Sequence, residues 1–187
     1  MDKRKEVLIK DLQNGERDIR TLSAEALERI QIRQNLARLV KTIESGEMLE
    51  KINALYVVAD LKGRKIIEII VRGFKDPVED VRAAAARALG SMDDNRVLSP
   101  LVDALTDTSP IVLRSAIEAL SRYNDIRLVG PLMKMLNNED SGVVEKALEV
   151  IGRIGDKRSE QAMLYFAIKG NKKMRALAIS ALGVMET

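Results

Sequence analysis

The sequence repeats itself every 31 residues, and this period constrains the fold more than any other feature of the chain. Three consecutive copies, 76–106, 107–137 and 138–168, follow one another without a gap. They share columns of apolar or small residues, such as Val81, Val112 and Val143, and Ala85, Ala116, Ala147 and Ala178. A fixed period of this length is typical of arrays in which one small structural unit stacks on the next.

The same register accounts for the rest of the chain. Looser copies occupy 14–44 and 45–75, residues 1–13 form an N-terminal half repeat, and residues 169–187 form a C-terminal half repeat. A chain of 187 residues can bury a core without disulfides or a structural metal. We therefore expect residues 1–187 to form a single repeat domain.

Within each copy the apolar residues follow a helical spacing twice. In 76–106 the first stripe predicts a helix A and consists of Val81, Ala85, Ala88, Leu89 and Met92. The second stripe predicts a helix B and consists of Val97, Leu98, Leu101, Val102 and Leu105. The β-branched segment 65–71 occupies helix B columns, so we expect a helix there rather than the strand that its composition suggests.

Proline indicates where these helices begin. Pro77 and Pro110 predict the starts of helix A, because a residue in the first turn needs no backbone N–H for the helix. By the same argument Pro100 and Pro131 lie in the first turn of helix B. The prolines therefore support the division of each copy into two helices.

The junction between helices A and B contains the adjacent carboxylates Asp93 and Asp94, a pair that would suit Mg²⁺ or acid–base chemistry. One junction column holds residue types that tolerate the left-handed conformation at a helix end, namely Asp93, Asn124 and Gly155. The next column holds residues able to cap the following turn, namely Asp94, Asp125 and Asp156. The other copies have no adjacent pair of carboxylates but keep an aspartate in the second of these columns. The repeat therefore favours a structural role for Asp93 and Asp94 over a metal or catalytic site.

The recurring pattern V-x-x-x-A-x-x-A-L-G-x-x-G/D/N-D-x-R-x-x-x-P-L-x-x-x-L resembles the HEAT-like repeats named after phycobilisome lyases. The resemblance implies an all-α, right-handed α-solenoid of stacked helical hairpins, an armadillo-like superhelix that serves mostly as a binding scaffold. It also implies a ladder in which Asp and Arg of neighbouring repeats bridge, formed by Asp94, Arg96, Asp125, Arg127, Asp156 and Arg158. Such a fold does not by itself dictate a function.

Residue types that most enzymes require are missing from the sequence, which contains no histidine and no cysteine. Catalytic relatives of the repeat depend on His-Glu iron ligands, as in the deoxyhypusine hydroxylase type, or on tryptophan, as in the HEAT-like DNA glycosylases. This chain has neither histidine nor tryptophan. The segment Gly152–Gly155 is similar to a nucleic-acid-binding GxxG loop, but Gly152 shares its column with Gly90, Ser121 and Gly183, all small residues at the junction between helices A and B. We therefore expect no catalytic activity, no metal and no cofactor.

The helix B face, which the resemblance places on the concave side, varies between copies and is more basic in the N-terminal half. Its candidate partner-binding residues are Lys10, Arg33, Lys41, Arg64, Arg72, Lys134 and Tyr165. This pattern favours a non-enzymatic adaptor that binds a protein partner, for example through an acidic segment. The last helix, with Ile179, Leu182 and Met185, is a second candidate surface, for self-association.

Two other functions stay open at this point. The chain would also suit an accessory subunit of an enzyme or cofactor-maturation complex, such as a bilin lyase-like assembly. Weak, sequence-independent nucleic-acid binding is less favoured, because aromatic residues amount to 3% and the net charge is only +3. Without a signal peptide, a membrane-spanning stretch or cysteine, the chain is expected in the cytoplasm.

Overall fold

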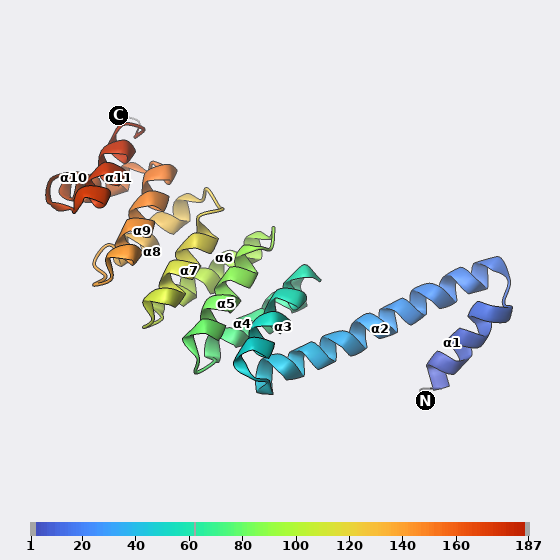
Figure 1. Cartoon of the computed structure of the whole chain (residues 1–187). Coiled ribbons are helices and arrows are strands. Elements are labelled where there is room, and N and C mark those ends of the chain that lie inside the picture. Colours follow the sequence, from blue (N-terminus) through green and yellow to red (C-terminus); the bar gives the residue numbers. More distant parts are fainter. Residues whose placement is uncertain (1–2, 62, 186–187) are drawn as a thin grey trace.

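The computed structural model describes residues 3–61 and 63–185, except the side chain of Arg33, and these residues fold into helices without a strand (Figure 1). The helices A of successive repeats lie side by side in one layer: α3 (Met48–Asp60), α5 (Glu79–Gly90), α7 (Pro110–Leu120), α9 (Ser141–Ile154) and α11 (Lys172–Leu182). The helices B form the second layer: α4 (Arg64–Arg72), α6 (Leu98–Asp103), α8 (Val129–Met135) and α10 (Glu160–Lys169). The predicted all-α solenoid is confirmed.

Local sequence signals explain where the helices A begin. The Ser109 hydroxyl accepts a hydrogen bond from the Ile111 N–H at 3.3 Å, and Pro110 is the first residue of α7, as predicted. For Pro77 the prediction is wrong, because α5 begins two residues later, at Glu79. In α9 the Asp140 carboxylate accepts a hydrogen bond from the Val143 N–H at 2.8 Å. Both contacts satisfy backbone donors that a helix N-terminus leaves free.

The ends of the helices A agree only in part with the prediction. Gly155 ends α9 in the left-handed conformation, with φ +69°, as expected. At Asp93 and Asn124 the prediction is wrong, because α5 already ends at Gly90 and α7 at Leu120. There the last turn tightens instead, as the Met92 N–H bonds to the carbonyl of Leu89 three residues back.

The helices B begin as the sequence predicts. The carboxylates of Asp94, Asp125 and Asp156 each accept a hydrogen bond from the backbone N–H two residues ahead, at 2.8–2.9 Å. Each of these caps opens a short 3₁₀ helix: η2 (Asn95–Val97), η4 (Ile126–Leu128) and η5 (Lys157–Ser159). Similar 3₁₀ turns follow α4 and α6, namely η1 (Gly73–Lys75) and η3 (Ala104–Thr106). The β-branched segment 65–71 lies in α4, so the helix expected there is confirmed.

The repeats stack through close contacts between successive helices A. A Cβ atom added to Gly90 would lie 2.6 Å from the Cβ of Ala119 on the next helix A. One at Gly152 would lie 2.7 Å from the Cβ of Ala181. Real carbon atoms do not approach so closely, so these positions require glycine. The stacked helices bury a continuous hydrophobic core along the solenoid.

The copy at 14–44 does not form the hairpin that the repeat register predicts. Residues 17–45 form one continuous helix, α2 (Arg17–Ser45), which packs against α1 (Lys3–Asn14). Gln31 and Ile32 stand where later copies carry the turn residues Asp93 and Asp94, so nothing interrupts the helix. Glu28 occupies the column of Gly90, and a side chain of that size is incompatible with close stacking of a helix A.

Consequently only the second half of α2 joins the solenoid. Ile43 is buried in the core, and Leu36, Leu39 and Val40 pack against it, as helix B columns should. The first half of α2 and the whole of α1 project away from the stack (Figure 1). We call these residues, 3–14 and 17–35, the α1–α2 hairpin.

The predicted Asp–Arg ladder between repeats is also wrong. Arg96 binds Asp94 of its own repeat at 2.6 Å, and the same holds for Arg127 with Asp125 and Arg158 with Asp156. Because each arginine follows its capping aspartate by only two positions, its side chain folds back onto that carboxylate. Of the three arginines, Arg158 also reaches the preceding repeat, through the Ile126 carbonyl at 3.0 Å.

A different set of ion pairs joins neighbouring repeats. Each pair links helix A to the start of the next repeat: Lys51–Asp76 at 2.7 Å, Arg82–Asp107 at 2.7 Å and Arg114–Asp140 at 3.0 Å. The hydrogen bond to Asp107 raises the pKa of the Arg82 guanidinium. A strict 31-residue register does not reveal these ion pairs, because Arg114 lies one residue and Asp140 two residues after the positions that correspond to Arg82 and Asp107.

Replacement of Gly90 by alanine tests the stacking contact. We expect Gly90→Ala to lower the free energy of unfolding by about 1–3 kcal/mol, because the new methyl group overlaps Ala119. The measurement is chemical denaturation followed by circular dichroism. Gly130→Ala is the matched control: its Cβ meets no atom within 4 Å, so it should be neutral or stabilising by about 0.5–1 kcal/mol. Equal stability of Gly90→Ala and the wild type would contradict the role given to this contact.

Candidate protein-binding surface

The basic residues singled out from the sequence do not form one cluster. Lys10 lies on α1, Lys41 on α2, Arg64 and Arg72 on α4, Lys134 on α8 and Tyr165 on α10, and all six are exposed. Arg33 lies in α2, but its side chain is outside the described part of the structure. Among these candidates Arg64 and Arg72 share a helix, where they lie at opposite ends of the nine-residue α4.

Acidic neighbours reduce the positive charge of those two arginines. Arg72 contacts the carboxylate of Glu44 at 2.5 Å, and Arg64 contacts that of Glu68 at 3.4 Å. Both pairs are well exposed, and pairs of this kind stabilise a protein by about 0–1 kcal/mol. They leave the arginines free to exchange partners, because little free energy is lost when an exposed pair opens.

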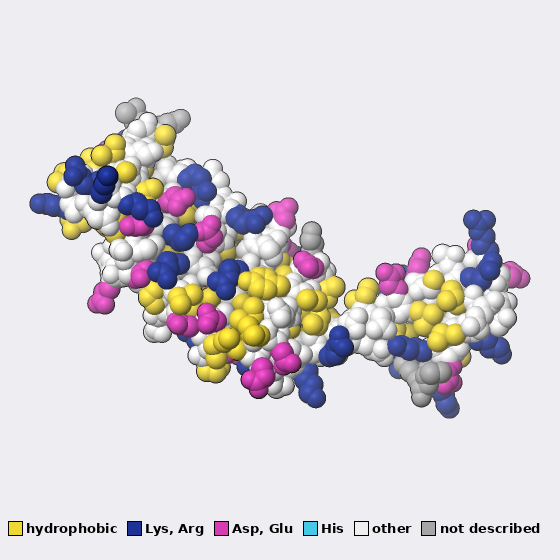
Figure 2. All heavy atoms as spheres, in the orientation of Figure 1, with side chains coloured by type: hydrophobic (Ala, Val, Ile, Leu, Met, Phe, Trp, Pro, Cys, Tyr) yellow, Lys and Arg dark blue, Asp and Glu magenta, His cyan; other side chains and the backbone are white. Residues whose placement is uncertain are grey.

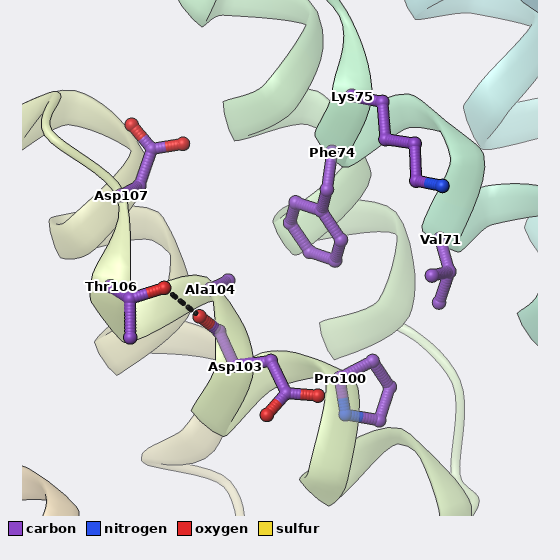
Figure 3. A pocket seen from close by; sticks show the side chains of 8 residues that line it. All are labelled: Val71, Phe74, Lys75, Pro100, Asp103, Ala104, Thr106 and Asp107. Atoms are coloured by element: carbon purple, nitrogen blue, oxygen red, sulfur yellow. Dashed lines mark hydrogen bonds between the residues drawn. The ribbon is translucent and has the colours of Figure 1, made fainter.

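The helix B side of the solenoid contains two grooves, each between successive helices B. The sequence did not reveal these grooves. The first lies between α4–η1 and α6–η3, with a volume of about 210 Å³ (Figure 3). Its apolar part consists of Val71, Phe74, Pro100 and Ala104, and its polar part of Lys75, Asp103, Thr106 and Asp107. The Thr106 hydroxyl donates to the Asp103 carbonyl at 2.8 Å and so closes the last turn of the helix.

The second groove lies one repeat further along, between η2–α6 and η4–α8, and has a volume of about 350 Å³. Apolar side chains line it again, namely Leu98, Val102, Leu128 and Pro131. Arg96 and Arg127 lie at its polar edge, together with Asp125. We call these two grooves the helix-B grooves. Their shared feature is an apolar lining with charged residues of both signs beside it.

The arginines of the second groove are held in place by their caps. Arg96 donates through Nε and Nη2 to both carboxylate oxygens of Asp94, at 2.6–3.0 Å, and Arg127 binds Asp125 in the same way. Hydrogen bonds from the Arg96 side chain lower the pKa of Asp94 from 3.8 to about 2. Each guanidinium is thus oriented while its Nη1 group can still donate to a partner.

The remaining sequence candidates have structural roles. Asp94 is a cap bound to Arg96, so the capping interpretation is confirmed for Asp94, whereas Asp93 lies beyond the end of α5 and does not terminate it. Gly152 packs against Ala181 of the next helix A, as expected for a small-residue column. Within residues 3–61 and 63–185 no group of three or more acidic side chains is placed to hold a metal ion.

On the predicted self-association surface, Ile179 of α11 is exposed, whereas Leu182 and Met185 are half-buried and pack against the core. The paired helix α10 also exposes apolar side chains: Tyr165, which the sequence singled out for partner binding, and Leu164 and Ile168, which it did not. Among the described residues no helix is long and apolar enough to cross a membrane.

The sequence matches the family of HEAT repeats over residues 36–121 and again over residues 100–183. Among solved structures, one engineered protein is similar to the chain, with a TM-score of 0.59, 20% identity and coverage of 98% of this chain and 96% of that one. A computationally designed armadillo repeat protein for modular peptide recognition is similar with a TM-score of 0.57 and 18% identity, covering 96% and 98%. These likenesses concern the fold alone. No curated protein matches the sequence.

The Asp94–Arg96 pair predicts a low titration midpoint for the Asp94 carboxyl group. Because the pKa of Asp94 is lowered in the folded state, the pair contributes to stability above pH 3.8, and this contribution is lost as the pH falls towards 2. In Arg96→Gln, the midpoint of Asp94 should rise from about 2 towards 3.8, because the donor responsible is gone. Carboxyl chemical shifts in an NMR titration measure this. Arg127→Gln serves as control and should leave Asp94 unchanged; the same midpoint in all three proteins would contradict the assignment.

Proposed function

The chain belongs to the HEAT-repeat family, and from this premise we propose that it is a non-enzymatic scaffold that binds an extended segment of a protein partner along the helix-B grooves. The observation that carries the proposal is the pair of grooves on consecutive repeats, each with an apolar lining beside charged residues. Solenoids of this type are typical protein-interaction scaffolds, since a regular stack of repeats presents an extended surface.

Repeat spacing favours an extended segment as the ligand. Helices packed side by side lie about 8–10 Å apart, and an extended chain advances about 3.3 Å per residue. A bound strand-like segment would therefore advance by one repeat about every third residue. One neighbouring structure is a designed armadillo protein for modular peptide recognition, which supports this mode of binding for the fold.

Charge supports a partner with acidic residues. Lys75 lies at the first groove, and Arg96 and Arg127 lie at the second, each arginine pre-oriented by its cap. Arg64 and Arg72 on α4 extend this positive charge towards the N-terminal side of the face. Asp103, beside the first groove, would repel a uniformly acidic peptide, so we expect acidic residues to alternate with apolar ones.

Peptides selected from a displayed random library against the full chain provide a direct test. We expect Phe74→Ala to weaken their binding by about tenfold, because an aromatic side chain in a groove is a typical hot spot. Lys75→Glu should weaken binding of the acidic peptides, and it leaves the groove lining intact. Isothermal titration measures both.

The control for this test is Arg122→Glu, an exposed residue that lines a groove on the helix A side of the solenoid. It changes the charge in the same direction as Lys75→Glu, but away from the proposed surface. Equal binding by Phe74→Ala, Lys75→Glu and the wild type, with circular dichroism showing intact folds, would reject the helix-B grooves as the binding surface.

An accessory subunit in an enzyme or cofactor-maturation complex, such as a bilin lyase-like assembly, is the second candidate, and the same grooves would then hold the catalytic subunit. Co-purification with an active enzyme distinguishes this role from a general adaptor. We keep the cytoplasm as the proposed compartment, because the sequence contains no cysteine.

Sequence-independent nucleic-acid binding is a third and weaker candidate, and it carries its own prediction. Because the exposed arginines of α4 have acidic partners and aromatic residues are scarce, we expect no binding of single-stranded or duplex DNA even at a salt concentration of about 20 mM. Fluorescence anisotropy with a labelled oligonucleotide measures it. Binding that weakens steeply with added salt would favour the nucleic-acid candidate instead.

A further inference from the structure

One face of α3, the face that carries Val57 and lies towards the preceding repeat, is exposed; we call it the outer face of α3. The equivalent face of the later helices A is buried. Val57 is 50% exposed, whereas Ala88, Ala119 and Val150 in the same column are 0%, 4% and 2% exposed. Leu49, two turns earlier on α3, is 66% exposed, and Met48, Tyr56 and Leu61 are exposed as well. The repeat itself thus identifies this face as one that another helix normally covers.

The cover in later repeats is the preceding helix A. Ala119 packs against Gly90 of α5, and Ala181 packs against Gly152 of α9, in both cases one repeat earlier. For α3 the preceding helix A would be the first half of α2, which projects away from the stack. Glu28 stands in the glycine column there, so this segment cannot close onto α3 of its own chain in the way that later repeats do.

The α1–α2 hairpin lacks a cover in the same way. No described residue of α1 is buried, and within 17–35 the buried residue is Ser23. Large apolar side chains are exposed on both of its helices, namely Val7, Ile9, Leu12, Ile19, Leu22 and Ile32. Figure 2 shows hydrophobic side chains on this hairpin and again over the α3 and α5 region, on the same side of the molecule. A helix of 12 residues such as α1, with no buried residue, is only marginally stable alone.

We propose that a second copy of this chain covers both surfaces, with the α1–α2 hairpin of each copy packed against the outer face of α3 of the other. A reciprocal exchange about a two-fold axis buries the hairpin and the α3 face of both chains at once. The α1–α2 hairpin and α3 contain more residues than the roughly 20–30 per partner that a specific interface uses.

Charge complementarity between the two surfaces favours this occupant. Residues 3–35 carry eight basic and six acidic side chains, a net charge of +2. Residues 47–60 carry three acidic side chains, Glu47, Glu50 and Asp60, and one lysine, a net charge of −2. That lysine, Lys51, is bound to Asp76, which leaves the surroundings of the α3 face acidic. Contact between unlike surfaces is therefore favoured over contact between two hairpins or two α3 faces.

The mass of the full chain in solution, measured by sedimentation over a range of concentrations, tests the proposal. We expect a dimer whose dissociation constant rises by more than about tenfold in Val57→Glu and in Leu22→Glu, since each places a carboxylate in an apolar contact. Ile126→Glu is the matched control, because Ile126 is also exposed, at 58%, but lies on η4 away from both surfaces. Circular dichroism verifies that each variant is folded.

Cysteine cross-linking identifies which surfaces meet, since the chain has no cysteine of its own. An equimolar mixture of Leu22→Cys and Val57→Cys chains should form a disulfide-linked heterodimer on mild oxidation, and a mixture of Leu22→Cys and Ile126→Cys should not. A monomer at all concentrations overturns the proposal. So does a dimer that Val57→Glu leaves unchanged, which would place self-association elsewhere, for example at α11.

Discussion

The close approach of successive helices A is the contact on which the rest of this solenoid depends. Gly90 and Gly152 let neighbouring helices meet at Ala119 and Ala181 with no room for a further carbon atom. The interior columns are then buried in repeat after repeat, and the helices B follow as the second layer. Where glutamate replaces the small residue, at Glu28, the stack stops and the helix runs on.

Both proposed surfaces are consequences of this stacking. On the helix B side, regular spacing sets two grooves one repeat apart, each with an apolar lining and charged residues beside it. At the N-terminal side, interrupted stacking leaves the face of α3 and the α1–α2 hairpin exposed together. The helix-B grooves thus arise where the repeats stack regularly, and they suit a different protein as partner. The exposed face of α3 and the α1–α2 hairpin arise where the stacking is interrupted, and they suit a second copy of this chain.

Much of the architecture was predictable, because local chemistry controls it. The caps at Asp94, Asp125 and Asp156, the first turns at Pro100, Pro110 and Pro131 and the helix over 65–71 all depend on residues close in sequence. The ion pairs were not predictable in the same way. Arg82 and Asp107 are 25 residues apart, and the corresponding Arg114 and Asp140 are displaced from the strict register, so pairing by column missed them.

The sequence by itself determined the period, the two helices of the regular repeats and the all-α class, since these follow from apolar spacing and from residues that cap or interrupt a helix. Tertiary structure alone decided that Gln31 and Ile32 continue a helix past the expected turn, and that Phe74 and Pro100 line one groove. The physical reason is that a groove or an uncovered face depends on which helices stack, and stacking depends on side-chain sizes compared across neighbouring repeats.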